Sequence, residues 1–187
     1  MNGLRYTLGI DPGATGAIVG IVIRPDKSYY LSDVIDNEDL YKRILTDDGL
    51  TPLETFRILL ANMTGGAFES FRVAIEKQQY LPKLGRQGGK SAFTLGYNYG
   101  YLRGALACAD YVDEIVDEVP PQTWQRIIYG AGDAYIEDTK ARSIAFAKKL
   151  LPELETTAAR GGLLHGRSDA ALIALYAARG LWKASHN

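Results

Sequence analysis

Three acidic residues stand where apolar segments begin or end, and carboxylates in such places can bind divalent cations. Asp11 and Glu76 each follow a short apolar run, and Asp169 precedes an apolar segment near the C-terminus. Mg²⁺ prefers oxygen ligands and keeps several waters, which leaves room for a phosphate oxygen. Two such ions about 4 Å apart activate a water and stabilise the leaving oxygen in phosphodiester cleavage. Each acid can equally be an ordinary turn, strand-end or helix N-terminal residue, so spacing alone leaves both interpretations open.

The elements that would position these acids follow from hydrophobic periodicity. We expect strands over 4–10, 17–23, 29–35, 71–76 and 115–119. We expect helices over 51–63, 90–108, 121–129, 138–150 and 168–182. Strands that first follow one another and then alternate with helices predict an α/β domain with a mixed sheet. If the strands before Asp11 and Glu76 are neighbours, both acids lie at one rim of that sheet.

Composition limits the class of protein. With 187 residues and a net charge of −1, the chain fits one domain, residues 1–187, and any nucleic-acid surface must be a local patch. The single cysteine, Cys108, excludes an internal disulfide and a cysteine-based zinc cluster, and it suits a reducing cytoplasm. We expect neither a signal peptide nor a membrane span, because no apolar run is long enough.

Six segments, in order, resemble the motifs of RuvC-like Holliday-junction resolvases. Three surround the acids, at residues 8–16, 73–79 and 165–174. The other three, at 82–104, 120–124 and 138–143, are similar to the bacteriophage branch of that family. Any one of these motifs is weak evidence, but six in the right order over roughly residues 4–180 make a specific match.

This resemblance implies a fold, an activity and partners. The fold would be ribonuclease-H-like, a mixed five-stranded sheet with helices on both faces. The activity would be metal-dependent cleavage of four-way DNA junctions by paired symmetric nicks, with two Mg²⁺ or Mn²⁺ ions in each site of a homodimer. A member of the bacteriophage branch would be phage-encoded and act in the cytoplasm of the bacterial host. Asp11, Glu76 and Asp169 fall on the family's catalytic acids.

A fourth site position is His165, four residues before Asp169. Family members carry an acid or a histidine near this place, so the fourth ligand is less defined than the other three. A neutral imidazole can bind a metal or accept a proton from water. The alternative is a loop histidine that only hydrogen-bonds to the backbone.

The segment 77–90 is the predicted DNA-binding surface. It has four positive charges and no acid, and it directly follows Glu76, so phosphates held there would lie beside the metals. Its aromatic ring can stack on an unpaired base, and its glutamines can hydrogen-bond to bases. The segment's candidates are Lys77, Gln78, Gln79, Tyr80, Lys83, Arg86 and Lys90. Further candidates for phosphate contacts are Lys140, Arg142 and Arg167.

Gly96, Gly100 and Gly104 form a bare stripe on the predicted helix over 90–108, beside an aromatic stripe. Each glycine costs a helix about 1 kcal/mol relative to alanine, so we expect close packing against either the chain's own sheet or a second subunit. The aromatic stripe favours core packing by itself, whereas the family resemblance suggests a dimer interface. For Trp124 we favour a place in the core.

Other functions compete with this interpretation. A ribonuclease-H-like nuclease for RNA or other branched DNA would share the fold and the acids. A non-catalytic junction binder would not need all three carboxylates. An actin-like or sugar-kinase ATPase also begins with a strand and a Gly-Ile-Asp turn, but it needs two such domains. Gly88–Ser91 lacks the first glycine of a P-loop at the required spacing.

Overall fold

The computed structural model describes residues 3–46, 49–66, 71–77, 89–108, 116–130, 138–158 and 161–184. Its five strands form one sheet in the order β3-β2-β1-β4-β5. The strands are β1 (Arg5–Ile10), β2 (Ala17–Ile23), β3 (Tyr29–Asp36), β4 (Phe71–Glu76) and β5 (Val116–Val119). Strands β1, β2 and β3 pair antiparallel, while β4 is parallel to both β1 and β5. The predicted mixed sheet of five strands is therefore confirmed.

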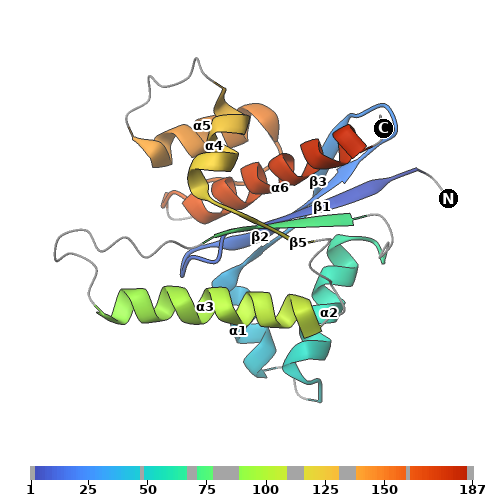
Figure 1. Ribbon diagram of the computed structural model, residues 1–187. Coiled ribbons are helices and arrows are strands. Elements are labelled where there is room, and N and C mark those ends of the chain that lie inside the picture. The colour runs from blue at the N-terminus through green and yellow to red at the C-terminus, as the bar shows by residue number, and fades with distance from the viewer. Residues whose placement is uncertain are drawn as a thin grey trace.

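Helices cover both faces of the sheet (Figure 1). On one face lie α4 (Pro121–Tyr129), α5 (Thr139–Leu150) and α6 (His165–Ala184); on the other lie α1 (Asn37–Thr46), α2 (Pro52–Met63) and α3 (Gly89–Cys108). Strand β2 serves both layers: Val19 and Ile21 pack in the cluster with α6, and Ile18 packs in the cluster with α1 and α2. A strand between two helical layers is apolar throughout, as β2 is, because both of its faces are buried.

Helix α6 packs directly on β1. A Cβ atom added at Gly9 would lie 2.0 Å from the carbonyl oxygen of Ala170 and 2.2 Å from the amide nitrogen of Ala174. Only a residue without a side chain allows that approach. The close packing fixes the start of α6 relative to the end of β1, where Asp11 follows.

One helix was absent from the sequence-based expectation, and another begins earlier than expected. Helix α1 was not predicted, although its buried residues Asn37, Leu40 and Ile44 have helical spacing. Helix α6 begins at His165 rather than at 168, so His165 belongs to the helix that carries Asp169. Helix α2 begins as expected, with a capping box in which Thr51 and Glu54 bond to each other's backbone amides.

The glycine stripe of α3 does not pack on the sheet of its own chain. Within the described part of the chain, no atom beyond the helix's own backbone lies within 4 Å of a Cβ built at Gly96, Gly100 or Gly104. The neighbouring Phe93 and Tyr97 are 74% and 61% exposed and stack on each other at 6.4 Å. The first of the two expected packing partners is therefore wrong, and the second, another subunit, stays a prediction.

Among the residues that the structure describes, no helix is both long enough and apolar enough to cross a membrane.

Candidate active site

Asp11 lies in a tight loop that the following residues hold in place. Its carboxylate accepts a hydrogen bond from the Gly13 amide at 2.8 Å. The side-chain amide of Asn37, the first residue of α1, donates to the carbonyl oxygens of Asp11 and Gly13 at 2.9 and 2.8 Å. A buried asparagine thus satisfies two loop carbonyls at once, which fixes the backbone under the Asp11 carboxylate.

The start of α6 is attached to the same loop. Gly16 and Gly166 form a parallel β-bridge, and a Cβ on Gly166 would lie 2.0 Å from the carbonyl oxygen of Thr15. Glycine at this position lets the helix N-terminus touch the loop backbone. The loop after β1 and the first turn of α6 are therefore one packed unit, and Asp169 lies one helical turn after His165, the first residue of α6.

Asp11 and Asp169 repel each other in a largely buried setting. Burial raises the pKa of Asp11 to about 7, the Gly13 hydrogen bond opposes the rise, and the charge of Asp169 adds to it. Burial also raises the pKa of Asp169, against the hydrogen bond of Ser143 and the charges of His165 and Lys140. Two partly buried carboxylates, one of which disfavours the charge of the other, form a place where a divalent cation would be stabilised.

Two polar atoms at this place have no hydrogen-bond partner among the described residues. They are Oδ1 of Asp169 and Nδ1 of His165, and both are buried. The two residues are one helical turn apart, so they lie on the same face of α6. Buried groups without partners are costly, and a bound ion with its waters would satisfy both. His165 therefore lies beside the acids, as expected for a fourth site residue.

Glu76 ends β4, next to the strand that leads to Asp11. The register pairs Ile10 with Ile75, so the two acids follow neighbouring parallel strands at one rim. Ala74 packs in the cluster with α6, and Glu76, two residues later, points to the same face. Its Oε2 accepts a hydrogen bond from Nε1 of Trp124 at 2.8 Å. Trp124 is fully buried, which confirms its predicted place in the core, but sequence reasoning missed its bond to Glu76.

The donor set partly fits a divalent cation. Asp11, Asp169 and His165 gather at the rim, with two orphaned polar atoms between them. Across the residues that the structure describes, however, no three histidine, cysteine, aspartate or glutamate side chains lie close enough together to hold a metal ion as they stand. An ion bound by all three acids would therefore require a side-chain adjustment, because the Glu76 carboxylate is hydrogen-bonded to Trp124.

The predicted DNA-binding residues have different surroundings. Lys77 and Lys140 are exposed, and the charge of Lys140 acts on Asp169. Arg142 lies over the ring of Tyr129, 4.6 Å from its centre, and Arg167 forms ion pairs with Asp36 and Glu155. These internal contacts give both arginines a structural use, so neither supports the expected phosphate contact. The remaining candidates lie outside the described residues (Gln78, Gln79, Tyr80, Lys83, Arg86) or have no described side chain (Lys90).

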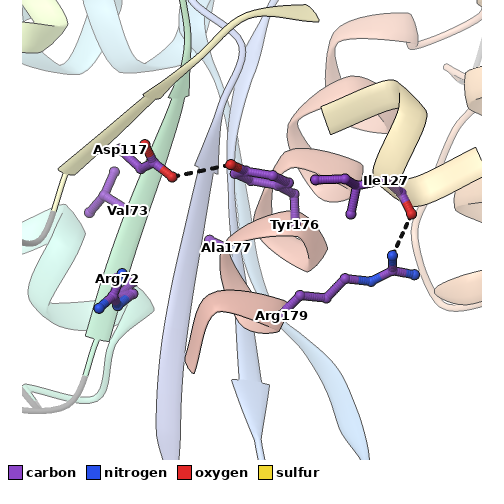
Figure 2. Close-up of a pocket in the computed structure, with 7 residues that line it drawn as sticks. All are labelled: Arg72, Val73, Asp117, Ile127, Tyr176, Ala177 and Arg179. Atoms are coloured by element: carbon purple, nitrogen blue, oxygen red, sulfur yellow. Dashed lines mark hydrogen bonds between the residues drawn. The ribbon is translucent and has the colours of Figure 1, made fainter. Parts of the chain in front are cut away.

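A pocket of about 250 Å³ lies away from these residues (Figure 2). Tyr176 donates a hydrogen bond to Asp117 there, and Arg179 donates one to the carbonyl oxygen of Ile127. Tyr176 follows Asp169 by seven residues, which is about 10 Å along a helix. None of the predicted site residues lines this pocket, so it is separate from the acidic rim.

Comparison with known proteins establishes the fold. No family model matches the sequence, and no curated protein matches it. RuvC of Thermus thermophilus is similar in structure, with a TM-score of 0.54 and 19% identity over 95% of this chain and 96% of that one. The yeast mitochondrial Holliday junction resolvase Ydc2 is similar with a TM-score of 0.57 and 15% identity, over 96% of this chain and 80% of that one. The chain thus has the α/β fold of these two proteins, which confirms the ribonuclease-H-like architecture expected from its sequence.

Proposed function

We propose that this protein is a divalent-metal-dependent endonuclease that cuts four-way DNA junctions. The observation that carries the proposal is the buried pair of Asp11 and Asp169, with Glu76 on the neighbouring strand, at the rim of a RuvC-like sheet. Ydc2, which has the same fold, is the Holliday junction resolvase of yeast mitochondria. A fold alone does not specify a reaction, so the proposal depends on the acids at the rim.

Asp11, Glu76 and Asp169 would hold the metal, Mg²⁺ or Mn²⁺ in the proposal, with two ions in each site. Bound there, the metal would supply an activated water and neutralise charge on the phosphate. His165 would either bind the metal or accept the proton of the water through its orphaned Nδ1. The structural support is the raised pKa of Asp11, which reflects first its burial and then the nearby charge of Asp169.

The proposal includes a positively charged approach to the site. Lys77 directly follows Glu76, and the exposed Lys140 acts electrostatically on Asp169. Both ammonium groups lie on elements that flank the acids, where they would attract a DNA phosphate. The segment 78–88 adds two positive charges from its sequence, Lys83 and Arg86, and the aromatic ring of Tyr80. Together these groups would position DNA strands against the metal.

A homodimer belongs to the same proposal. Paired nicks in a four-way junction need two active sites related by a two-fold axis. The exposed face of α3, with Phe93, Tyr97 and the glycine stripe, is the surface we propose for the contact. The bare backbone at Gly96, Gly100 and Gly104 would let a second helix approach closely, which explains three glycines inside one helix.

A cleavage panel tests the proposed function. The purified protein with Mg²⁺ would be offered a four-way junction, a fork, a linear duplex and an RNA–DNA hybrid of matched sequence. We expect the junction to be cut fastest, with nicks at symmetric positions on opposing strands. Faster cleavage of the hybrid or the fork would show that the protein is a nuclease with a different substrate. Tight binding of the junction without cleavage in Mg²⁺ or Mn²⁺ would contradict the proposal that the protein is an enzyme.

A further inference from the structure

We infer that Trp124, Tyr129 and Ser143 are positioning residues that connect Glu76 to Asp169 through α4 and α5. This inference rests on the proposed function, because it concerns how the acids are presented to a metal. The two helices lie beside α6 on one face of the sheet (Figure 1). They contribute none of the three acids, yet each carries a side chain that bonds to one of them.

The connection begins at Glu76. Trp124 lies in α4, which starts directly after β5, and its ring is 0% exposed. A buried indole N–H requires an acceptor, and here that acceptor is the Glu76 carboxylate at 2.8 Å. The backbone is held as well, since the amide of Lys77 donates to the carbonyl oxygen of Val119 at 2.8 Å. Both the side chain and the following backbone of Glu76 are therefore fixed by the β5–α4 segment.

Tyr129 carries the connection from α4 to α5. Its ring meets the ring of Trp124 edge to face, with 5.8 Å between centroids and 64° between planes. The Tyr129 ring also packs on Phe146 of α5, at 4.7 Å between centroids. Its phenol oxygen lies 2.8 Å from Oγ of Ser143, and both groups are buried. The aromatic contacts hold the ring, so the phenol meets Ser143 in one defined geometry.

The connection ends at Asp169. Ser143 is buried in α5, which packs on α6, and its side chain lowers the pKa of Asp169 against the larger effect of burial. A hydroxyl has one proton, so when Ser143 donates to Asp169 it accepts from Tyr129. The Ser143 hydroxyl also donates to the carbonyl oxygen of Thr139, 3.1 Å away, so Thr139 and Asp169 compete for its one proton. Glu76 and Asp169 are thus held by two ends of one buried network.

This arrangement has a consequence for metal binding. Groups that orient metal ligands raise affinity because less side-chain freedom is lost when the ion binds, and removing such a group typically weakens affinity or activity 10–100-fold. Trp124→Phe keeps an aromatic ring but removes the N–H donor, and Tyr129→Phe removes only the phenol. We expect Trp124→Phe to raise the Mg²⁺ concentration for half-saturation by about 10-fold and Tyr129→Phe by a smaller factor. In the double variant the effects should be less than additive in free energy, because both changes break one network.

The test uses metal-induced thermal stabilisation of the DNA-free protein, titrated with Mg²⁺ and Mn²⁺. The matched control is Phe56→Leu, which loosens the fully buried core on the other face of the sheet and leaves the acids' contacts intact. The control should unfold at a lower temperature yet keep the wild-type half-saturation concentration. An unchanged half-saturation concentration in Trp124→Phe, within a factor of two, would overturn the inference.

A second measurement does not depend on the folding of a Trp124 variant. The chain has two tryptophans, so Trp182→Phe leaves Trp124 as the only source of tryptophan fluorescence. We expect Mg²⁺ to change the emission of Trp124 with the same half-saturation as the thermal titration, because its hydrogen-bond acceptor would become a metal ligand. Thermal stabilisation by Mg²⁺ without any change in emission would refute the role of Trp124.

The same data separate this inference from the proposed function. If the protein cuts no DNA substrate but Trp124→Phe weakens its metal binding, the proposed nuclease function is wrong and the positioning network still holds. If the protein cuts junctions and Trp124→Phe keeps the normal metal affinity, the nuclease function holds and the positioning network is wrong. A protein that neither Mg²⁺ nor Mn²⁺ stabilises would overturn both.

Discussion

Arg167 and Asp36 form a two-point ion pair between residues 131 positions apart in the sequence, with nitrogen–oxygen distances of 2.8 and 2.7 Å. Asp36 ends β3 and Arg167 lies in the first turn of α6, which also carries Asp169. A third nitrogen of the guanidinium donates to Glu155 at 3.1 Å. The pair therefore fixes the start of α6 against the far strand of the sheet, and it places Asp169 at the rim.

The first prediction concerns this pair. Arg167→Lys keeps the charge but loses the planar two-point contact, so we expect the free energy of unfolding to fall by about 1–3 kcal/mol. Denaturation in urea measures the change. The control is Lys42→Ala, which removes an exposed ion pair with Glu38 and should cost much less. Equal, small losses in the two variants would show that the Arg167 contact contributes no more than a surface pair.

The second prediction concerns Asp11 without metal. Its pKa is raised from 3.8 to about 7 in the folded protein, so its charge destabilises the fold increasingly as the pH rises through that range. Asp11→Asn removes this penalty, which is at most about 4 kcal/mol at 1.4 kcal/mol for each pKa unit. We expect the variant to exceed wild type in thermal stability at pH 8, by a larger margin than at pH 5.

Added Mg²⁺ should change that order. The ion would stabilise the wild type at pH 8 by binding the acid pair and would stabilise Asp11→Asn less. Thermal unfolding in chelator and in Mg²⁺ gives both comparisons. A variant less stable than the wild type at pH 8 in chelator would show that the buried Asp11 charge is not a source of instability.

Strands β1, β2 and β4 could be predicted from the sequence because each contains apolar residues in a continuous or alternating pattern and ends next to turn or polar residues. Asp11 and Glu76 could be placed for the same reason, since both end such runs. The bond between Trp124 and Glu76 could not, because it depends on how α4 packs against β4, and periodicity does not encode that packing. The sequence pattern predicted that Trp124 is buried but could not predict which group accepts the hydrogen bond of its N–H.

Two other features show the same limit. Leu40 and Ile44 of α1 have helical spacing and could have revealed that helix, but the role of Asn37 under the Asp11 loop depends on tertiary contacts. The glycine stripe of α3 predicted a closely packed helix face, and its packing against a second subunit stays a prediction. Its first suggested partner, the chain's own sheet, was wrong because spacing along one helix says nothing about which surface it meets.

The third prediction tests the glycine face. Within the chain, a Cβ at Gly100 meets open space, so Gly100→Ala should stabilise a monomer by up to about 1 kcal/mol through helix propensity. In the proposed dimer the same methyl group would separate the two helices. We expect Gly100→Ala to weaken self-association, measured by light scattering over a concentration series. Leu45→Ala, at an 82% exposed position on α1, is the control and should leave it unchanged. A more stable variant with an unchanged molecular mass in solution would exclude this face as the interface.

The fourth prediction concerns DNA binding by the segment after Glu76. Lys83→Ala combined with Arg86→Ala should weaken junction binding and lower the slope of log affinity against log salt by about 2, because two phosphate contacts would no longer release counter-ions. The control pair is Lys148→Ala with Lys149→Ala, two exposed residues in the last turn of α5. Affinities over a salt series provide both slopes. Equal slopes in the two double variants would make Lys83 and Arg86 ordinary surface charges.

The most direct test of the nuclease assignment is cleavage of a four-way junction by the wild type and by Asp169→Asn, each with and without Mg²⁺. Asp169 is the acid that both repels Asp11 and carries an orphaned oxygen at the rim, and asparagine keeps its size. We expect Mg²⁺-dependent nicks in the wild type and a loss of at least about 100-fold in the variant, with junction binding and folding retained. Cleavage by Asp169→Asn at the wild-type rate would contradict this assignment, because the reaction would then not use the acidic rim.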